Sequence, residues 1–379
     1  MLHHIRKSAW RRSAMLVSAT MLAMTILAAC GGGNKELSLQ FQGTDKGDVV
    51  ATYKGGQVTQ AEFDKYLDLF VVAQPAYEQI VMIPDFQKMI LEQYVSYKVL
   101  SGQASEETLT QARKDADEQL KQFKEYVDQD ESFKKLVKDK KVTDADMGTF
   151  LLLTTVVVAQ VNSMVTDADM DEAYESMKAN FGTYSVRHIL VQTHEQDAAT
   201  GEQKEVRTLE EALEIANEVK AKLDAGGDWN ELAKQYSDDP GSKENGGLYE
   251  NAKGSGWVES FKQAAFEQEL NAVGEPFQSE FGYHVMKVEK RELPELDALT
   301  EDEKKAVQNT AAMNVMDKFM QEEMPKQELN ITLPEPEPTE GADEGDAEGG
   351  AGAGNAEPTE PADGAGNAGN AESTAPAGQ

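Results

Sequence analysis

Two histidines on short apolar segments are the residues of this sequence that could most readily do chemistry. His188 lies in residues 186–191 and His284 in residues 281–288, and the chain has only five histidines, two of them among its first four residues. Between the two segments, residues 236–247 are rich in Ser, Asp, Pro and Gly. An imidazole changes charge near neutral pH and offers two distinct ring nitrogens for hydrogen bonding. This grouping indicates a functional site.

Strand alternation predicts which side chains share a face with each histidine. Successive side chains of a strand point to opposite faces. One face of the first segment therefore carries Val186, His188 and Leu190, and its other face carries Arg187, Ile189 and Val191. In the last segment, His284 shares a face with Met286 and Val288.

The N-terminus, residues 1–29, has the pattern of a signal peptide. A basic start precedes an apolar stretch at residues 14–29, which ends in Leu-Ala-Ala before Cys30. Small residues before a lone cysteine resemble the lipobox of bacterial lipoproteins, and that resemblance implies a lipid on Cys30. The alternative is an ordinary secretory signal with an incidental cysteine. Because Cys30 is the only cysteine, an intramolecular disulfide and a thiolate metal cluster are excluded, and we expect neither a metal nor another cofactor.

The charge is strongly acidic, −32 overall. Residues 334–379 contain 11 acids, no aromatic residue and no Lys or Arg, so we expect a disordered acidic tail. Without them, 57 acidic side chains still stand against 36 basic ones. A surface that tracks phosphates needs clustered Lys and Arg, so nucleic acid is excluded as a partner.

Residues 30–46 read as a tether, and a mostly helical region follows at residues 47–182. A hairpin is expected at residues 49–58, and helices at residues 86–100 and 106–127. Helix starts are marked by threonines followed by acids, at Thr59, Thr143, Thr166 and Thr208. The helix after Thr208 should point Leu209, Ala212, Leu213, Ala216, Val219 and Leu223 inward. The apolar run at residues 151–158 is too short to span a membrane and fits a buried helix. Residues 292–333 predict a helix at 300–323 and a short strand.

The blocks of residues 183–290 resemble, in order, the parvulin peptidyl-prolyl isomerases. A strand with His188 is followed by two helices, the Ser-Asp-Asp-Pro-Gly-Ser turn, Gly246-Gly247, an aromatic helix and a strand with His284. The flanking helical parts resemble the SurA/PrsA extracytoplasmic foldases. The resemblance implies an α+β fold, in which a parvulin domain (residues 183–291, a four-stranded antiparallel sheet with surrounding helices) is inserted in a helical chaperone domain. It also implies a location outside the cytoplasm, anchored by lipid to the bacterial cell membrane, and is compatible with a homodimer.

The resemblance also implies a site. If the two strands pair centrally, as in parvulins, the rings of His188 and His284 meet on one side of the sheet. Asp239 stands where family members carry Cys or Asp, and Ser279 where a hydroxyl residue is common. The proline pocket maps to Tyr249, Trp257 and Phe261, with Phe266 beneath.

The chemistry implied is rotation about X-Pro bonds. Amide resonance sets a barrier of about 18–20 kcal/mol, and no covalent step is needed to cross it. A catalyst must hold proline in an apolar pocket and favour the twisted amide over the planar one. The paired histidines are expected to shape and orient the site more than to transfer protons. The implied substrates are unfolded or partly folded secreted proteins.

Two departures from the family pattern leave other functions open. Residues 248–251 read Leu-Tyr-Glu-Asn where Asp-Leu-Gly is usual, and Ser255-Gly256-Trp257 replaces Gly-Gln-Met. The alternative is therefore a holdase chaperone with a weak or inactive parvulin domain. A solute-binding lipoprotein would instead show two similar lobes. The loop at residues 192–207 has only Lys204 and Arg207 as bases, so phosphoserine-proline specificity is not expected.

Overall fold

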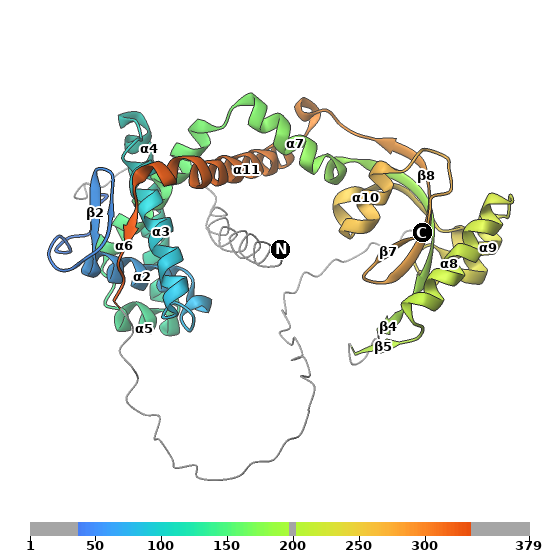
Figure 1. Ribbon diagram of the computed structural model, residues 1–379, viewed down its shortest axis with the longest axis horizontal. Coiled ribbons are helices and arrows are strands. Elements are labelled where there is room, and N and C mark those ends of the chain that lie inside the picture. Colours follow the sequence, from blue (N-terminus) through green and yellow to red (C-terminus); the bar gives the residue numbers. More distant parts are fainter. Residues whose placement is uncertain (1–36, 197–201, 335–379) are drawn as a thin grey trace, which may run out of the picture. The chain divides into compact units, whose positions relative to one another are not determined.

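A computed structural model describes residues 37–196 and 202–334 of the chain (Figure 1). The signal segment, Cys30 and the acidic tail beyond residue 334 lie outside the described residues. The fold is α+β, as expected: a helical part with one small sheet, and a sheet domain at residues 183–292.

The expected tether is shorter than the sequence suggested. Phe41 is buried in the core of the helical part, where its ring lies 6.4 Å from that of Tyr94. Thr44 is also buried, and its carbonyl accepts a hydrogen bond from the Thr59 hydroxyl. Residues 37–46 are therefore packed against the helical part, because an aromatic side chain supplies apolar area that a free tether would leave in water.

The helical part begins with an antiparallel hairpin and continues through a run of helices. Its elements up to the sheet domain are β1 (Val49–Tyr53), β2 (Gly56–Thr59), α2 (Gln60–Ala73), η2 (Pro75–Tyr77), α3 (Pro84–Ser101), α4 (Glu106–Gln129), α5 (Glu131–Asp139), α6 (Asp144–Met164) and α7 (Asp167–Phe181). Phe63, Tyr66 and Phe70 of α2 are buried, as their helical spacing predicts.

Threonine caps start the helices as predicted, with one exception. Thr143, Thr166 and Thr208 form complete capping boxes with acids three residues on. At Thr59 only half of the box forms: the Thr59 hydroxyl accepts from the Glu62 N–H, but the Glu62 carboxylate turns away. It accepts from Tyr94 Oη at 2.7 Å and pairs with Lys98, because a buried carboxylate gains more from these two donors, one of them charged, than from one backbone N–H.

After the sheet domain the chain returns to the helical part. The returning elements are η5 (Leu296–Ala298), α11 (Glu301–Lys318), the π-turn η6 (Phe319–Glu323), η7 (Met324–Gln327) and β9 (Asn330–Ile331). Strand β9 pairs antiparallel with β1, and α11 packs on α7 and α6. Both flanks of the sheet domain thus build one helical part, as an inserted domain requires.

Helix α6 contains the apolar run at residues 151–158. By length and composition it is the one helix of the described residues that could cross a membrane, yet half of its most apolar window is buried inside the protein. Phe150, Leu153 and Val157 lie in the main core cluster, so α6 acts as a core helix.

The sheet domain holds four antiparallel strands in the order β6-β3-β8-β7 (Figure 1). These are β3 (Thr183–Gln192), β6 (Leu248–Lys253), β7 (Phe277–Ser279) and β8 (Gly282–Glu292). Helices α8 (Leu209–Asp224) and α9 (Trp229–Tyr236) cover one face, where they bury Ile189, Val191 and Val285. Helix α10 (Glu259–Glu267) covers the other face over Val186, Met286 and Val288. The predicted alternation is confirmed.

Two predictions for this domain are wrong. Leu209 is 48% exposed, because it is the first residue of α8, before the helix meets the sheet; Leu213 is half-buried outside the cluster. Residues 192–207 are not a plain loop, because β4 (His194–Gln196) and β5 (Gln203–Glu205) pair there as an antiparallel ribbon.

Candidate active site

Strand register brings the two histidines together. In the β3–β8 pair His188 lies opposite Met286, and Leu190 lies opposite His284. The histidines are therefore diagonal neighbours on one face, a position from which rings can touch. Their Nδ1 atoms are 3.3 Å apart, with ring centroids separated by 5.6 Å. Both side chains are buried, each with 3% exposure. The prediction that the rings meet is confirmed.

The histidine pair is the middle of a four-residue hydrogen-bond chain. His188 Nε2 lies 2.9 Å from Asp239 Oδ2, and His284 Nε2 lies 2.7 Å from Ser279 Oγ. Because an ionised carboxylate only accepts, His188 carries its proton on Nε2. A neutral His188 then accepts at Nδ1 from His284 Nδ1–H, and the Ser279 hydroxyl donates to His284 Nε2. The chain thus fixes both ring orientations.

Burial keeps His284 neutral. Removal from water lowers the pKa of His284 to about 3, a proton on His188 would act in the same direction, and the Asp239 charge opposes them. A neutral His284 can act as the hydrogen-bond acceptor or donor of the pair without adding a second buried charge.

Asp239 is the charged end of the chain. Burial alone raises the pKa of the Asp239 carboxyl, but hydrogen bonds from His188, Ser242 and the Gly241 amide outweigh burial and hold the pKa well below its usual range. The Ser242 hydroxyl bonds Asp239 Oδ2 and lies 3.2 Å from His188 Nε2. Sequence reasoning missed Ser242, although its place in the Asp-Pro-Gly-Ser turn was a signal, since Ser hydroxyls bond locally in turns.

The turn that carries Asp239 is tied to strand β3. Asp238 N–H donates to the Leu190 carbonyl at 2.8 Å, which extends the sheet past the end of α9. On the other side, Gly247 accepts from His188 N–H at 2.9 Å and has φ +73°. A Cβ at Gly247 would lie 2.0 Å from the His188 carbonyl oxygen, so only glycine lets the two backbones approach this closely.

An aromatic cluster lies against the histidine pair. Phe261 of α10 meets the rings of His188 and His284 edge to face, with centroids 5.0 and 5.3 Å away. Trp257 lies 5.0 Å from Phe261. Phe277, directly opposite His284 in the β7–β8 pair, stacks on it at 5.2 Å. The structure therefore brings Trp257 and Phe261 to the site as predicted, and adds Phe277.

Phe266 does not join this cluster. It is half-buried on α10, outside the group of apolar side chains packed around Phe261 and Met286. Five residues separate Phe266 from Phe261, which at about 100° per residue places them on different sides of the helix. Phe277, from the neighbouring strand, takes the place that we predicted for Phe266.

Tyr249 stacks on His188, with ring centroids 5.4 Å apart and an interplanar angle of 26°. Its hydroxyl donates to Asp239 Oδ2 at 3.0 Å. Burial, the Asp239 charge and this hydrogen bond raise the pKa of Tyr249 to about 12, so the hydroxyl keeps its proton at neutral pH. Tyr249 therefore contributes both an apolar ring and a donor.

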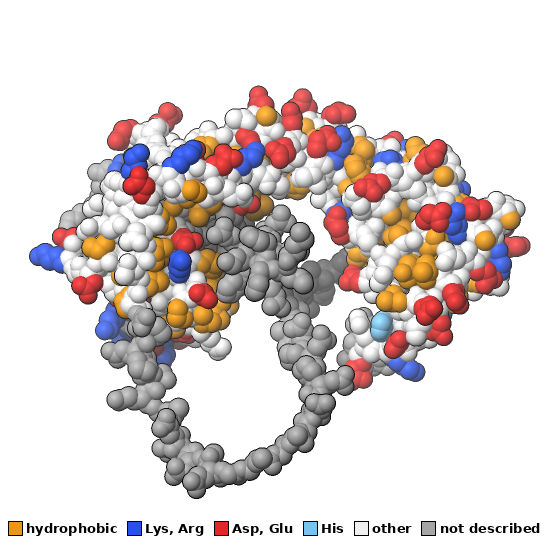
Figure 2. Space-filling model, in the orientation of Figure 1, with side chains coloured by type: hydrophobic (Ala, Val, Ile, Leu, Met, Phe, Trp, Pro, Cys, Tyr) orange, Lys and Arg blue, Asp and Glu red, His pale blue; other side chains and the backbone are white. Residues whose placement is uncertain are grey.

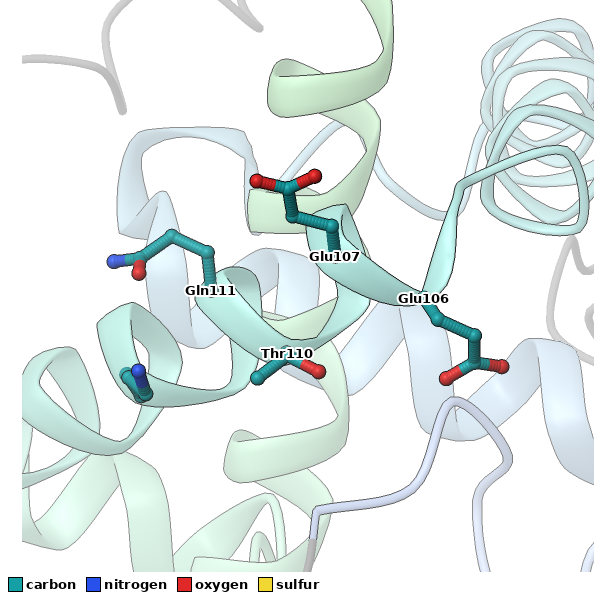
Figure 3. Close-up of a pocket in the computed structure, with 5 residues that line it drawn as sticks. Glu106, Glu107, Thr110 and Gln111 are labelled. Atoms are coloured by element: carbon teal, nitrogen blue, oxygen red, sulfur yellow. The ribbon is translucent and has the colours of Figure 1, made fainter.

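A surface pocket elsewhere offers no comparable chemistry. It lies along the first turns of α4 and is lined by Glu106, Glu107, Thr110, Gln111 and Lys114, which all project from that one helix (Figure 3). Within residues 37–196 and 202–334, no group of three or more His, Cys, Asp or Glu side chains is placed to hold a metal ion.

Comparison with known proteins agrees with the geometry. Residues 172–292 match the family model of the PPIC-type peptidyl-prolyl isomerase domain. The chain is 25% identical over 292 residues to the foldase protein PrsA of Caldanaerobacter subterraneus, covering 74% of this chain and 83% of that protein. It is 28% identical over 302 residues to a parvulin-like PPIase of Rickettsia felis, covering 76% and 90%. The chain contains a PPIC-type (parvulin) peptidyl-prolyl isomerase domain and is similar to PrsA foldases over about three quarters of its length.

A crystal structure of the peptidylprolyl isomerase PrsA from Bacillus cereus is also similar, with 26% identity, a TM-score of 0.41, and coverage of 74% of this chain and 90% of that one. The isomerase match begins inside α7, before the boundary at residue 183 that we expected. Contacts fit the earlier start: the Ala179 carbonyl accepts from Tyr184 Oη at 2.9 Å, and Asn180 bonds Lys262 of α10.

Proposed function

We propose that this foldase catalyses cis/trans isomerisation of X-Pro bonds at the face formed by the two histidines and the aromatic cluster. The observation that carries the proposal is the chain Asp239–His188–His284–Ser279, buried against the ring of Phe261. This arrangement combines an apolar wall for a proline ring with fixed polar groups, which is what rotation about an imide bond requires.

Each group has a distinct role in this proposal. The rings of Phe261, Trp257 and Tyr249 hold the proline ring, and the paired histidines set the shape of the surface beneath the imide. Asp239 places a negative charge where the carbonyl carbon of the bond rotates, and the Ser279 hydroxyl holds His284. Because these groups are already fixed by mutual hydrogen bonds, they need no rearrangement as the imide twists.

The test is exchange spectroscopy of a short Ala-Pro peptide with and without the full mature chain. We expect the cis/trans exchange rate to rise in proportion to protein concentration, and Phe261→Ala to reduce the rise at least tenfold. Because uncatalysed exchange takes tens to hundreds of seconds, even weak catalysis is measurable. An exchange rate equal to background at the highest soluble concentration would contradict the proposal.

The anchor and the location are further parts of the proposal. The residues before Cys30 support a lipid on that cysteine and attachment to the outer face of the bacterial cell membrane. Its substrates would then be unfolded or partly folded secreted proteins with X-Pro bonds. Cys30→Ser should move the protein from the membrane fraction to the soluble fraction and abolish metabolic labelling with palmitate. Labelling that survives the substitution would rule out lipid on Cys30.

Domain borders and a homodimer remain predictions from the resemblance. Light scattering of the mature chain measures the dimer, and limited proteolysis measures the borders. A mass of one chain at all concentrations tested would contradict the dimer.

The alternative function, a holdase with a weak isomerase domain, has one observation in its favour. The loop of residues 78–83 in the helical part exposes Met82 at 71% and Ile83 at 48%, which is apolar surface suited to unfolded chains. If holdase action is independent, the double variant His188→Ala/His284→Ala should still suppress aggregation of a reduced test protein, and Met82→Ser/Ile83→Ser should not. Loss of suppression in a folded double-histidine variant would count against the alternative.

A further inference from the structure

The Asp239 carboxylate receives more donors than its role as a partner of His188 needs. His188 Nε2, the Ser242 hydroxyl and Tyr249 Oη all converge on Oδ2, and Gly241 N–H donates to Oδ1 at 3.1 Å. The Asp239 side chain is only 14% exposed, so these bonds replace water. Of these four donors, two belong to the turn itself and one is His188. The Tyr249 hydroxyl is the fourth, and it comes from strand β6.

Local geometry directs the Tyr249 hydroxyl to this oxygen. Tyr249 lies opposite Val186 in the β3–β6 pair, so its ring is on the site face and diagonal to His188. Gly241 leaves the space that the hydroxyl fills: a Cβ at that position would lie 2.8 Å from Tyr249 Oη. Two independent features, the register of β6 and a glycine in the turn, thus place one hydroxyl.

We propose that Tyr249 is a positioning residue, whose hydroxyl holds the Asp239 carboxylate in the orientation that pairs with His188 and limits its pull on the imidazole proton. This inference rests on the proposed isomerase function of the site, but it concerns a hydroxyl that proline binding does not need. The ring of Tyr249 contacts the substrate, and its hydroxyl acts through Asp239.

The Tyr249 hydroxyl reduces the negative charge of Asp239 that acts on His188. A hydroxyl that donates to a carboxylate disperses its negative charge, so the carboxylate attracts a protonated imidazole less strongly. The polar groups in contact with this pair are Ser242 from the turn, His284 from β8 and Tyr249 from β6. The neighbouring Asp238 instead forms an ion pair with Arg207 and accepts a hydrogen bond from the backbone N–H of Gln192. Removing the Tyr249 hydroxyl should therefore act mainly on His188.

The experiment compares three variants of the full mature chain. Tyr249→Phe keeps the ring and removes the hydroxyl. Gly241→Ala keeps the hydroxyl but displaces it. Tyr283→Phe is the matched control, because Tyr283 packs in the cluster on the opposite face of the sheet. For each variant, the His188 Nε2–H signal is recorded by ¹H,¹⁵N NMR at pH 7, and kcat/KM for an Ala-Pro peptide is measured at the same pH.

We expect Tyr249→Phe and Gly241→Ala to move the His188 Nε2–H signal, because Asp239 Oδ2 loses a competing donor. Both variants should lower kcat/KM at pH 7 about fivefold to tenfold, with the larger part of the loss in kcat. The control should match the wild type. An unchanged His188 Nε2–H signal in Tyr249→Phe would overturn the inference, as would loss of activity without a change in that signal, which signifies a packing role only. If the wild type shows no catalysis, the proposed function fails, and the His188 Nε2–H signal alone still decides this inference.

Discussion

Burial of His284 makes the stability of the isomerase domain depend on pH in a way that can be worked out. His284 is 3% exposed, and burial lowers its pKa to about 3. In the unfolded chain a histidine has a pKa of about 6.5. On acidification the unfolded chain therefore takes up a proton at His284 before the folded chain does.

The sign and the size follow from proton linkage. The contribution of neutral His284 is fully present above pH ~6.5 and is lost as the pH falls from there toward about 3. For one such group the free energy of unfolding drops by about 2 kcal/mol between pH 7 and pH 5, with a limiting slope of about 1.4 kcal/mol per pH unit.

Urea unfolding followed by tryptophan fluorescence measures this loss. Of the three tryptophans, Trp10 lies in the predicted signal peptide, while Trp229 and Trp257 lie in the isomerase domain, so fluorescence of a chain that begins at residue 30 reports on that domain. Between pH 7 and pH 5, the free energy of unfolding of the wild type should fall by about 2 kcal/mol more than that of His284→Gln. The matched control His194→Gln changes an exposed histidine and should keep the wild-type slope. Parallel slopes for wild type and His284→Gln would refute the reasoning.

Three further substitutions, and Gly226→Ala as a control, test the supports of the site by urea unfolding. Asp239→Asn should cost about 2 kcal/mol of unfolding free energy at pH 7, because its donors lose a charged acceptor. The pKa of Asp239 is depressed in the folded chain, so the deficit should persist above pH ~4 and shrink below it, where the unfolded wild-type chain takes up a proton at Asp239. Gly247→Ala should cost more than about 2 kcal/mol, since its Cβ meets the His188 backbone, whereas Gly226→Ala, with φ +87° and open space around it, should cost about 1 kcal/mol. Equal losses of unfolding free energy for the two glycine variants would contradict the close approach of Gly247 to the His188 backbone. Thr208→Ala should lower the free energy of unfolding by about 1 kcal/mol, because it removes the capping box of α8. No change would show that α8 does not depend on its cap.

Much of the isomerase site could be predicted from the sequence, because period-2 alternation fixes which side chains share a face. The face-sharing neighbours of His188 and of His284 were predicted in this way. Alternation does not fix the register between strands that are far apart in the chain, so the diagonal contact of the two rings depended on the family resemblance. Asp239, Trp257 and Phe261 followed from the same ordered blocks.

What could not be predicted depends on one unpredicted turn and on tertiary contacts. Phe277 reaches the site because β7 and β8 form a hairpin, with Ser279 paired to Gly282, and we predicted no hairpin there. Glu62 left its capping box because Tyr94 and Lys98 lie close in the fold. Phe41 is buried, although its neighbours read as a polar tether. For Glu62 and Phe41, a long-range contact outweighed a local preference.

The negative charge is also a property of the folded part. Acidic side chains are spread over the face drawn in Figure 2, with basic ones interspersed among them. The described domains themselves therefore present a surface unsuited to following a phosphate backbone, in agreement with the excess of acids that remains when the tail is left out.

The most direct test of the central claim is the catalytic rate of the double variant His188→Ala/His284→Ala. Proline-peptide exchange should be accelerated by the wild-type mature chain and fall to near background in the double variant, while its NMR spectrum shows the sheet domain folded. Leu209→Ala, an exposed position on α8, should keep the wild-type rate. Full acceleration by a folded double variant would contradict the assignment of catalysis to the histidine pair.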